Sequence, residues 1–373
     1  MIHLQNNRIE VLRAMLVGKQ IDALLVTNSF NITYLTGFTT LAPYEREAFV
    51  LVTRRNVYLF SDGRYENKCQ NLNVKYQNSS TNLQFRLLSA NNNLINHIRE
   101  IIKEENIKIL GFEREDLKWS EYESITSGLK NTLFPMDRII IQNRAVKDEI
   151  EMKCIENACK INDQSLIELI PYIKYGKSEK EIAFLFETIV KNKGYELSFD
   201  PIVAVDKNSS IPHYNTKTGG GIIQQNSIVL IDCGVKYKGY CSDMTRTFFV
   251  GKISDTLRKT YTVLQKTQQQ TIDQIKEGGT FFDIDQYCRK QIADGGLSDY
   301  PHSTGHGVGL EVHEYPKVST FSTEKVTQNN TFTIEPGVYY SGQWGMRIED
   351  TICLDNKGNG TVLTQFSKEI MLL

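Results

Sequence analysis

Two pairs of carboxylates lie in the C-terminal half of the chain, each pair in apolar surroundings. Asp232 follows the apolar run SIVLI, and Asp243 comes eleven positions later (243 − 232) in YCSDMTRTFF. The segment VKYKGY between them has a hairpin pattern, which would place the two aspartates at opposite or diagonal positions, about 5–8 Å apart. Glu335 ends the run TFTIE, and Glu349 lies in GMRIED beyond the turn SGQWG. The sequence therefore predicts two hairpins, each carrying a pair of carboxylates.

Four carboxylates in apolar surroundings need positive charge beside them, because a buried carboxylate without a partner is strongly destabilising. Arg246 and Arg347 lie close to the acids in the sequence and would supply part of that charge. A pair of divalent metal ions, with His306 as a further ligand, would supply more. Four carboxylates and one imidazole form a hard, oxygen-rich ligand set, which suits Mn²⁺ more than a thiolate-type zinc site would. We therefore expect two divalent ions, with Mn²⁺ preferred and Co²⁺ or Zn²⁺ as alternatives.

Four of the six histidines fall in the same half of the chain. One is His213, and the segment YPHSTGHGVGLEVHE contains the other three, His302, His306 and His313. Glycines alternate along this segment, so we expect something bulky and polar to lie against its backbone. Taken singly, a histidine or a strand aspartate is more often structural than catalytic. Five ligand-type residues in order on strand-like segments together predict a functional site.

The N-terminal half has the alternation of helices and strands that is typical of an α/β domain. We expect helices over residues 7–19 and 94–105, strands over 22–27 and 108–113, and a hairpin over 49–62. The pattern changes near Pro135, so the sequence predicts an accessory α/β domain over residues 1–135 and a second domain over 136–373.

The second domain begins with an amphipathic helix over residues 148–170. Ser178 with Glu181, and Thr280 with Asp283, have the spacing that opens a helix with a capping box. A further helix is expected between Ser254 and the Gly278-Gly279 pair. The expected strands of this domain are PIVAV, SIVLIDCG, GYCSDMTRTFFV, NTFTIEPGVYY and GMRIEDTICL.

Bulk properties exclude several classes of function. The 373 residues carry a formal net charge of -1, so the basic footprint of a nucleic-acid-binding protein is absent. The apolar runs are far shorter than a bilayer span, and the N-terminus has no secretory pattern. The seven cysteines are scattered without a CxxC pair, which favours free thiols in a reducing compartment. We therefore expect a cytoplasmic protein that binds neither nucleic acid nor membranes.

The order D…D…H…E…E resembles the pita-bread metallopeptidases, which include methionine aminopeptidase, aminopeptidase P, prolidase and the metal-free creatinase. The segments IDCGVKYKGYCSDMTRTF, HSTGHGVGLEVHE, TIEPGVY and GMRIEDT carry the resemblance over about residues 140–373. NSFNITYLTGFT and VYLFSDGRYE resemble the accessory domain of aminopeptidase P and prolidase, which methionine aminopeptidase lacks. The implied fold is α/β: a pita-bread, creatinase/aminopeptidase-like domain preceded by a smaller creatinase/prolidase-type domain.

The resemblance implies a role for each predicted ligand. Asp232 would bind one metal, and Asp243 and Glu349 would bridge the two. His306 and Glu335 would bind the second. The family's nucleophile is a bridging water or hydroxide, because metal coordination lowers the pKa of water toward neutrality. Glu335 would then move its proton.

The resemblance also implies roles beside the metals. His302 and His313 would hold the scissile carbonyl and stabilise the oxyanion. His213 matches a position lining the proline-side pocket, and Arg347 would help bind the substrate or orient Asp243. The expected partners are a peptide with proline in second position and, as is common in the family, a second copy of the chain.

The expected reaction is hydrolysis of an Xaa-Pro bond beside a free N-terminus. Aminopeptidase P takes longer peptides and prolidase takes dipeptides. No extra basic cluster stands out beside the histidines, which favours the aminopeptidase, with an Xaa-Pro dipeptidase as the alternative. A non-catalytic peptide-binding module and a creatinase-like amidinohydrolase are disfavoured because all five ligands are present.

Overall fold

The computed structural model describes residues 2–76, 81–130, 132–355 and 357–373. It divides into two compact units, Met1–Asn143 and Arg144–Leu373. The predicted boundary after residue 135 lies inside strand β6 (Thr132–Met136), which pairs in parallel with β5 (Ile109–Glu113) of the first unit. Helix α6 (Ile139–Ala145) follows β6 and spans the point where the two units meet in the sequence.

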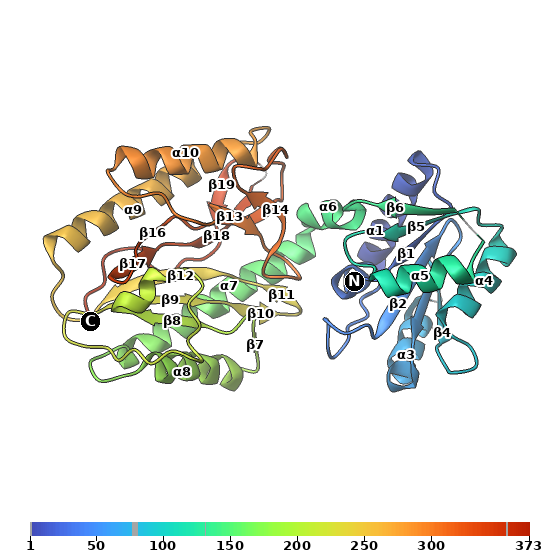
Figure 1. Cartoon of the computed structure of the whole chain (residues 1–373), viewed down its shortest axis with the longest axis horizontal. Coiled ribbons are helices and arrows are strands. Elements are labelled where there is room, and N and C mark those ends of the chain that lie inside the picture. Colours follow the sequence, from blue (N-terminus) through green and yellow to red (C-terminus); the bar gives the residue numbers. More distant parts are fainter. Residues whose placement is uncertain (1, 77–80, 131, 356) are drawn as a thin grey trace. The chain divides into compact units, whose positions relative to one another are not determined.

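The first unit is an α/β domain built on one mixed sheet (Figure 1). The strand order is β4-β3-β2-β1-β5-β6. The predicted hairpin over residues 49–62 is confirmed as an antiparallel pair. The strands other than β5 and β6 are β1 (Ala23–Val26), β2 (Ala48–Thr53), β3 (Asn56–Ser61) and β4 (Asn82–Leu87). The helices, with η for a 3-10 turn, are α1 (Ile2–Gly18), α2 (Ser29–Thr36), η1 (Gly63–Tyr65), α3 (Glu66–Tyr76), α4 (Leu94–Glu105) and α5 (Trp119–Gly128).

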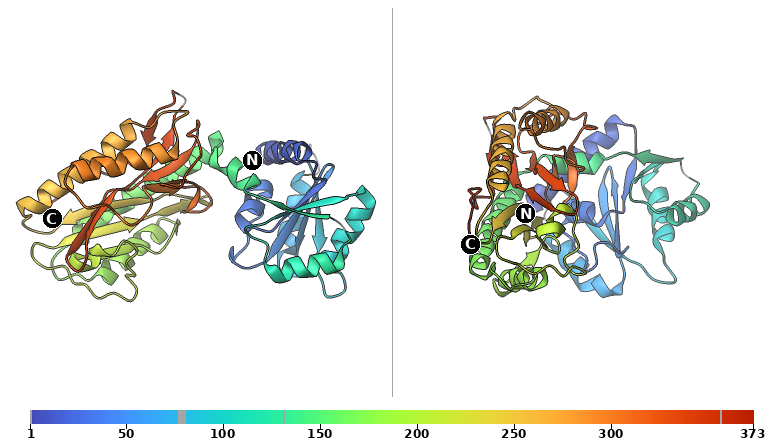
Figure 2. Two further views of the ribbon diagram at one scale, coloured as in Figure 1. Left: turned by 45° about the horizontal axis from the view of Figure 1, so that its top comes forward. Right: turned by 60° about the vertical axis from the view of Figure 1, so that its left-hand side comes forward.

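The second unit places helices outside short, strongly twisted sheets (Figures 1 and 2). Helices α7 and α8 pack together on the β8–β10 side, and α9 and α10 pack together on the β14–β15 side. Both predicted capping boxes, at Ser178 and Thr280, are confirmed. The helices are α7 (Glu149–Leu169), η2 (Ile170–Tyr172), α8 (Glu179–Asn192), η3 (Asp206–Ser210), α9 (Asp255–Asp273) and α10 (Phe281–Asp294).

The strands of the second unit form separate small sheets, in the orders β11-β10-β7, β12-β9-β8, β14-β13-β15-β18-β19 and β16-β17. Apolar side chains from β8, β9 and β12 form a core against α7 and α8. The first strands are β7 (Glu196–Leu197), β8 (Ile202–Val205), β9 (Ile228–Cys233), β10 (Val235–Tyr237), β11 (Tyr240–Cys241), β12 (Met244–Phe249) and β13 (Gly305–Gly307). The others are β14 (Glu314–Val318), β15 (Thr331–Ile334), β16 (Gly337–Tyr340), β17 (Trp344–Arg347), β18 (Asp350–Leu354) and β19 (Gly360–Val362).

Both carboxylate hairpins are present, but their strands are interrupted at the acids. Asp243 lies between β11 and β12, Glu335 between β15 and β16, and Glu349 between β17 and β18. The prediction of unbroken strands is therefore wrong there, because the backbone changes partner. The Glu335 N–H donates to Thr304, and the Glu349 N–H donates to Thr245 of β12. Asp243, Glu335 and Glu349 therefore lie at breaks between strands, whereas Asp232 lies within β9.

None of the described helices is both long and apolar enough to cross a membrane. Each of the seven cysteines is described, and all are buried and free of disulfide bonds, as the sequence predicts.

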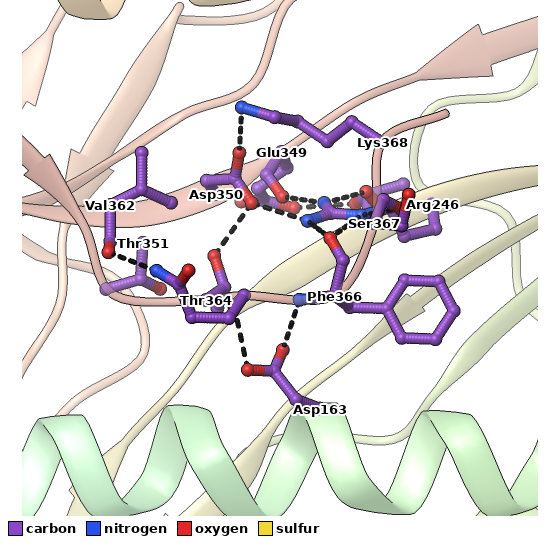
Figure 3. A network of polar contacts seen from close by, with 12 residues as sticks. Asp163, Arg246, Glu349, Asp350, Thr351, Val362, Thr364, Phe366, Ser367 and Lys368 are labelled. Atoms are coloured by element: carbon purple, nitrogen blue, oxygen red, sulfur yellow. Dashed lines mark hydrogen bonds and ion pairs between the residues drawn. The ribbon is translucent and has the colours of Figure 1, made fainter. Parts of the chain in front are cut away.

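A buried polar network joins the C-terminal segment to the strands that carry the acids (Figure 3). The Arg246 side chain is 1% exposed. Its guanidinium donates to the backbone carbonyls of Thr245, Glu349 and Phe366 and pairs with the Asp350 carboxylate at 2.6 Å. Asp350 also accepts from Thr364, Gln268 and Lys368. The expectation that Arg246 supplies part of the charge beside the four acids is not met by an ion pair among the described residues, because its donors hold main-chain carbonyls and Asp350 instead.

Arg246→Met should destabilise the protein by about 3–5 kcal/mol, because it leaves a buried carboxylate without its main partner. Arg258 lies on α9 with an exposed side chain, and Arg258→Met should change the free energy of unfolding by no more than about 0.5 kcal/mol. Urea unfolding of both variants measures the difference. Equal stabilities would show that the network contributes little.

Candidate metal centre and substrate pocket

The five predicted ligands converge inside the second unit. His306 Nε2 lies 3.5 Å from Asp243 Oδ2, 3.5 Å from Glu335 Oε1 and 4.0 Å from Glu349 Oε1. Two overlapping groups each bring their ligand atoms within 4.8 Å of one another: Asp232 with Asp243 and Glu349, and His306 with Glu335 and Glu349. The groups share Glu349, so the arrangement has room for two adjacent ions that share a ligand.

The strand registers explain this convergence. Asp232 pairs with Thr245, which places Asp243 diagonally across the first hairpin. Ile334 pairs with Asp350 and Gly337 with Arg347, so Glu335 and Glu349 occupy matching positions between the two ladders. The side chain of Thr351 joins the hairpins by accepting from the Asp243 N–H at 3.2 Å and donating to the Asp243 carbonyl at 2.8 Å.

One arginine compensates the acids directly. Over the residues that the structure describes, Arg347 is the one lysine or arginine that pairs with any of the four carboxylates, through Asp232 Oδ2 at 2.6 Å. Arg347 Nε also donates to Thr245 Oγ1 at 3.0 Å, and Thr245 Oγ1 donates to Glu349 Oε2 at 2.6 Å. One guanidinium and one hydroxyl therefore connect an acid of each hairpin.

Burial makes full ionisation of this cluster unfavourable. It raises the pKa of Glu335 to about 8, with Asp232 adding to the effect. Burial and the charge of Glu349 raise the pKa of Asp243 well above its usual range. Burial also lowers the pKa of His306 to about 3, so this imidazole is neutral. A neutral imidazole among buried acids can act as a metal ligand without first losing a proton.

The donor set fits divalent cations. Asp232 Oδ1 and Asp243 Oδ1 are buried and accept no hydrogen bond within the described part of the chain, which costs about 1–3 kcal/mol for each unsatisfied group. The Nδ1–H of His306 donates to its neighbour Gly307 O at 3.1 Å, so the Nε2 lone pair faces the acids. A cation among these atoms would occupy the free lone pairs and reduce the repulsion among the carboxylates.

The histidines beside this cluster are held differently. The His302 Nδ1–H donates to Ser303 O at 2.8 Å, which leaves Nε2 to accept from the Tyr339 hydroxyl at 2.9 Å. The Tyr339 oxygen in turn accepts from Arg347 Nη1 at 2.9 Å. The His313 ring makes no hydrogen bond over the described residues and stacks edge-on against His306, with ring centroids 4.3 Å apart.

His313 also lies close enough to Asp243 and His306 to form a further ligand-type group. The sequence analysis assigns it a role beside the metals rather than as a ligand, so both roles are open to it by distance.

The glycines of the histidine segment meet polar groups of the protein itself. A Cβ at Gly305 would lie 1.8 Å from Thr333 O, and one at Gly309 would lie 2.4 Å from Glu314 Oε1. The expectation of something polar against this backbone is confirmed, and the polar groups are a neighbouring strand and a buried carboxylate.

A pocket of about 420 Å³ opens onto the cluster. All nine residues that the sequence analysis selected line it: His213, Asp232, Asp243, His302, His306, His313, Glu335, Arg347 and Glu349. The other lining residues are Phe199, Ile202, Pro212, Ser303 and Lys317. The pocket thus combines an apolar wall, an acidic floor and an exposed lysine.

Sequence reasoning missed the five other lining residues, Lys317 among them, and also Thr245 and Tyr339, which contact Glu349 and Arg347. Tyr339 is diagonal to Arg347 across the second hairpin, a contact that the predicted strand pairing contained. Lys317 is directly opposite His306 in the β13–β14 pair. The segment around it was not predicted as a strand, so no sequence signal placed Lys317 in the pocket.

Known proteins are similar to this chain in both sequence and fold. The model of metallopeptidase family M24 matches residues 153–356, and that of the creatinase/prolidase N-terminal domain matches residues 8–146. An Xaa-Pro dipeptidase of Pyrococcus horikoshii is 31% identical over 99% of this chain and 99% of its own length.

Two solved structures cover almost the whole chain. The Xaa-Pro dipeptidase from Bacillus anthracis has a TM-score of 0.89 at 30% identity, covering 99% of this chain and 100% of the other. The X-Pro aminopeptidase from Thermotoga maritima has a TM-score of 0.86 at 29% identity, with 98% and 99% covered. The protein therefore belongs to metallopeptidase family M24, whose pita-bread domain here follows a creatinase/prolidase-type N-terminal domain.

Proposed function

We propose that the protein is an Xaa-Pro dipeptidase that depends on two divalent metal ions. The observation that carries this proposal is the composition of one pocket: an acidic, histidine-containing floor, an apolar wall and Lys317. The named activities of the relatives from Pyrococcus horikoshii and Bacillus anthracis support it. The preference for dipeptides replaces the aminopeptidase favoured from sequence, because that choice rested on the apparent lack of a basic group near the histidines.

The metal ligands proposed are those that the family resemblance implies. Asp232 would hold one ion, His306 and Glu335 the other, and Asp243 and Glu349 both. When bound, the ions would polarise the scissile carbonyl and activate a water molecule near neutral pH. Mn²⁺ is the expected metal because most of the ligand atoms are carboxylate oxygens.

The protein's own residues would position the peptide and move protons. Glu335 lies beside both His306 and His302, 3.9 Å from His302 Nδ1, and would carry the proton released by the attacking water. The His313 ring packs against His306 without making a hydrogen bond among the described residues, and it would donate to the developing oxyanion. His302, held by Ser303 and Tyr339, would contribute to the same side of the pocket. Its present hydrogen bonds would have to exchange for it to donate from Nε2.

The substrate would fill the pocket with proline against the apolar wall. Phe199, Ile202 and Pro212 offer a surface for the ring, and His213 lies at the same side. The hydrogen bonds of Arg347 go to Asp232, Thr245, Tyr339 and Pro212 O, so we propose that it orients these groups. Lys317 then remains as the cation for the carboxylate of a dipeptide, since a charge-assisted hydrogen bond is the strong kind.

An Xaa-Pro aminopeptidase remains the second candidate, favoured by the similarity to the Thermotoga maritima enzyme. Both activities would use the same acids and histidines. They differ in the part of the peptide that follows proline, which is a free carboxylate in a dipeptide and further residues in a longer peptide. Lys317 has an exposed side chain, so a longer peptide would pass it without having to enter a closed cavity.

Chelation should abolish hydrolysis of Xaa-Pro peptides, and divalent metal should restore it, Mn²⁺ most fully. Returning the ion at about 100 times its Kd should also raise the free energy of unfolding by about 2.7 kcal/mol, because the ion binds the folded state alone. Peptide hydrolysis and thermal unfolding of stripped and reloaded protein measure these effects. Full activity after exhaustive removal of metal would disprove the two-metal proposal.

Measuring the metal content of alanine variants distinguishes histidines that bind metal from histidines that act on the substrate. His302→Ala and His313→Ala should each lower kcat by about 10²-fold, as for loss of one transition-state donor, with metal content nearly unchanged. His306→Ala should lose metal from one site. Elemental analysis beside steady-state kinetics distinguishes the outcomes. Loss of metal in His313→Ala would make that residue a ligand, in keeping with its distance from Asp243.

Lys317→Met should raise KM for an Xaa-Pro dipeptide about tenfold, equivalent to about 1.4 kcal/mol of binding. The same variant should barely change KM for the dipeptide amide, which lacks the carboxylate. Lys266→Met, at an exposed position on α9, is the matched control. If wild type prefers a peptide extended by two residues over the dipeptide by more than about tenfold in kcat/KM, the protein is an aminopeptidase instead.

A further inference from the structure

Glu179 is a buried acid outside the metal centre and is not among the residues that line the pocket. It is the first residue of α8, and its side chain is 0% exposed. Over the described residues it has no ion-pair partner, and its carboxylate accepts four hydrogen bonds instead. A carboxylate buried without a cation is rare, so the groups that satisfy it indicate what it is for.

The four donors are Val205, at the end of β8, and three residues of the segment that follows it and carries His213. Oε1 accepts from Val205 N at 2.7 Å and from Asn208 Nδ2 at 2.9 Å. Oε2 accepts from the Tyr214 hydroxyl at 2.8 Å and from Gly221 N at 2.7 Å. We call residues 206–221 the His213 loop. The Glu179 carboxylate therefore holds the backbone at both ends of the loop, at Val205 and Gly221. It also holds the side chains of Asn208 and Tyr214 within the loop.

Two glycines of the loop allow the Glu179 carboxylate to lie close to the loop backbone. A Cβ at Gly221 would lie 2.4 Å from Glu179 Oε1, and one at Gly219 would lie 3.0 Å from Oε2 and 2.0 Å from the Tyr214 hydroxyl. A Cβ at Gly220, between them, would meet no atom within 4 Å. The close contacts lie on the side of the loop that faces Glu179.

The loop contributes to the pocket at the residues next to Tyr214. Pro212 and His213 line the pocket, and the Pro212 carbonyl accepts from Arg347 Nη1 at 3.2 Å. The Tyr214 hydroxyl is thus held on one side of the loop while its neighbour His213 meets the substrate space on the other. His213 itself is exposed, so its position depends on the backbone that carries it.

We infer that Glu179 is a positioning residue that fixes the His213 loop against the pocket and so sets substrate binding at the proline side. The inference rests on the proposed function for the part played by His213. The negative charge is needed for a geometric reason. Each carboxylate oxygen accepts from one backbone N–H, and a backbone N–H cannot turn away, so an amide NH₂ at either position would face a donor.

Glu179→Gln and Gly221→Ala test the inference, with Glu181→Gln and Gly220→Ala as matched controls. Glu181 lies two residues after Glu179 in the first turn of α8. Its carboxylate forms the capping box with Ser178 and does not contact the loop. We expect kcat/KM for an Xaa-Pro dipeptide to fall about tenfold or more in the two test variants, mainly through KM, and less than about twofold in the controls. Metal content should be unchanged in all four.

A double-mutant cycle separates positioning from a general loss of stability. In a His213→Ala background, Glu179→Gln should have little further effect on KM, because the two residues act through one element. A loss that persists at full size would overturn the inference. Tyr214→Phe, which removes one of the four donors, provides a milder variant if Glu179→Gln does not fold, and it should show the same dependence on His213.

Hydrogen exchange gives a readout that does not depend on activity. Amides of the His213 loop should exchange faster in Glu179→Gln and Gly221→Ala than in wild type or the controls. Unchanged exchange in the loop would overturn the inference whatever the kinetics. If wild type does not hydrolyse Xaa-Pro peptides, the proposed function fails, and the exchange data still decide whether Glu179 holds the loop.

Discussion

Mutual repulsion among Asp232, Asp243, Glu335 and Glu349 constrains the whole second unit. Each acid is at most intermediate in exposure, and water screens such charges poorly inside a protein. Arg347 compensates one of them directly, and burial raises the pKa of Glu335 to about 8. The folded chain must therefore hold like charges together by a rigid frame until cations bind. That requirement explains why the strands change partners at the acids and do not simply continue.

The frame is built from buried charges that bind backbone. Arg246 holds one carbonyl in each acidic hairpin, those of Thr245 and Glu349. Arg289 of α10 pairs with Asp285 and donates to the His302 carbonyl, while Arg144 and Lys147 both pair with Glu314, the residue after His313. The segments of His302 and His313 are thus each fixed by a charged side chain from a helical segment outside the sheets. Rigid support of this kind is what preorganised catalytic groups require.

Spacing alone predicted the part of the site that depends on local pairing. A hairpin brings residues such as Asp232 and Asp243 together whatever the rest of the chain does, so the two carboxylate pairs could be found from sequence. Contacts between hairpins could not. The direction of the Arg246 side chain was not predictable, because the carbonyls of Glu349 and Phe366 that it contacts lie far along the chain. Lys317 lies opposite His306 in a pair of strands that is local in the sequence. It was missed because the segment around it shows no clear strand pattern and the register shifts between His306 and Gly307. The predicted domain limit after residue 135 falls in β6, an edge strand of the first sheet.

The residues proposed to select a substrate and those proposed to perform chemistry occupy different kinds of position. Asp243 and Glu349 are buried at breaks between strands, where their N–H groups donate to Thr351 and Thr245, so a change there would disturb the frame as well as the proposed reaction. Lys317 and His213 are exposed and line the pocket. Substitution at such positions alters the pocket while leaving the buried network intact. Relatives with this fold are named as a dipeptidase and as an aminopeptidase. Under the proposed function, the length of peptide that this protein accepts would depend on exposed groups such as Lys317 and His213, while the buried acids would serve either activity.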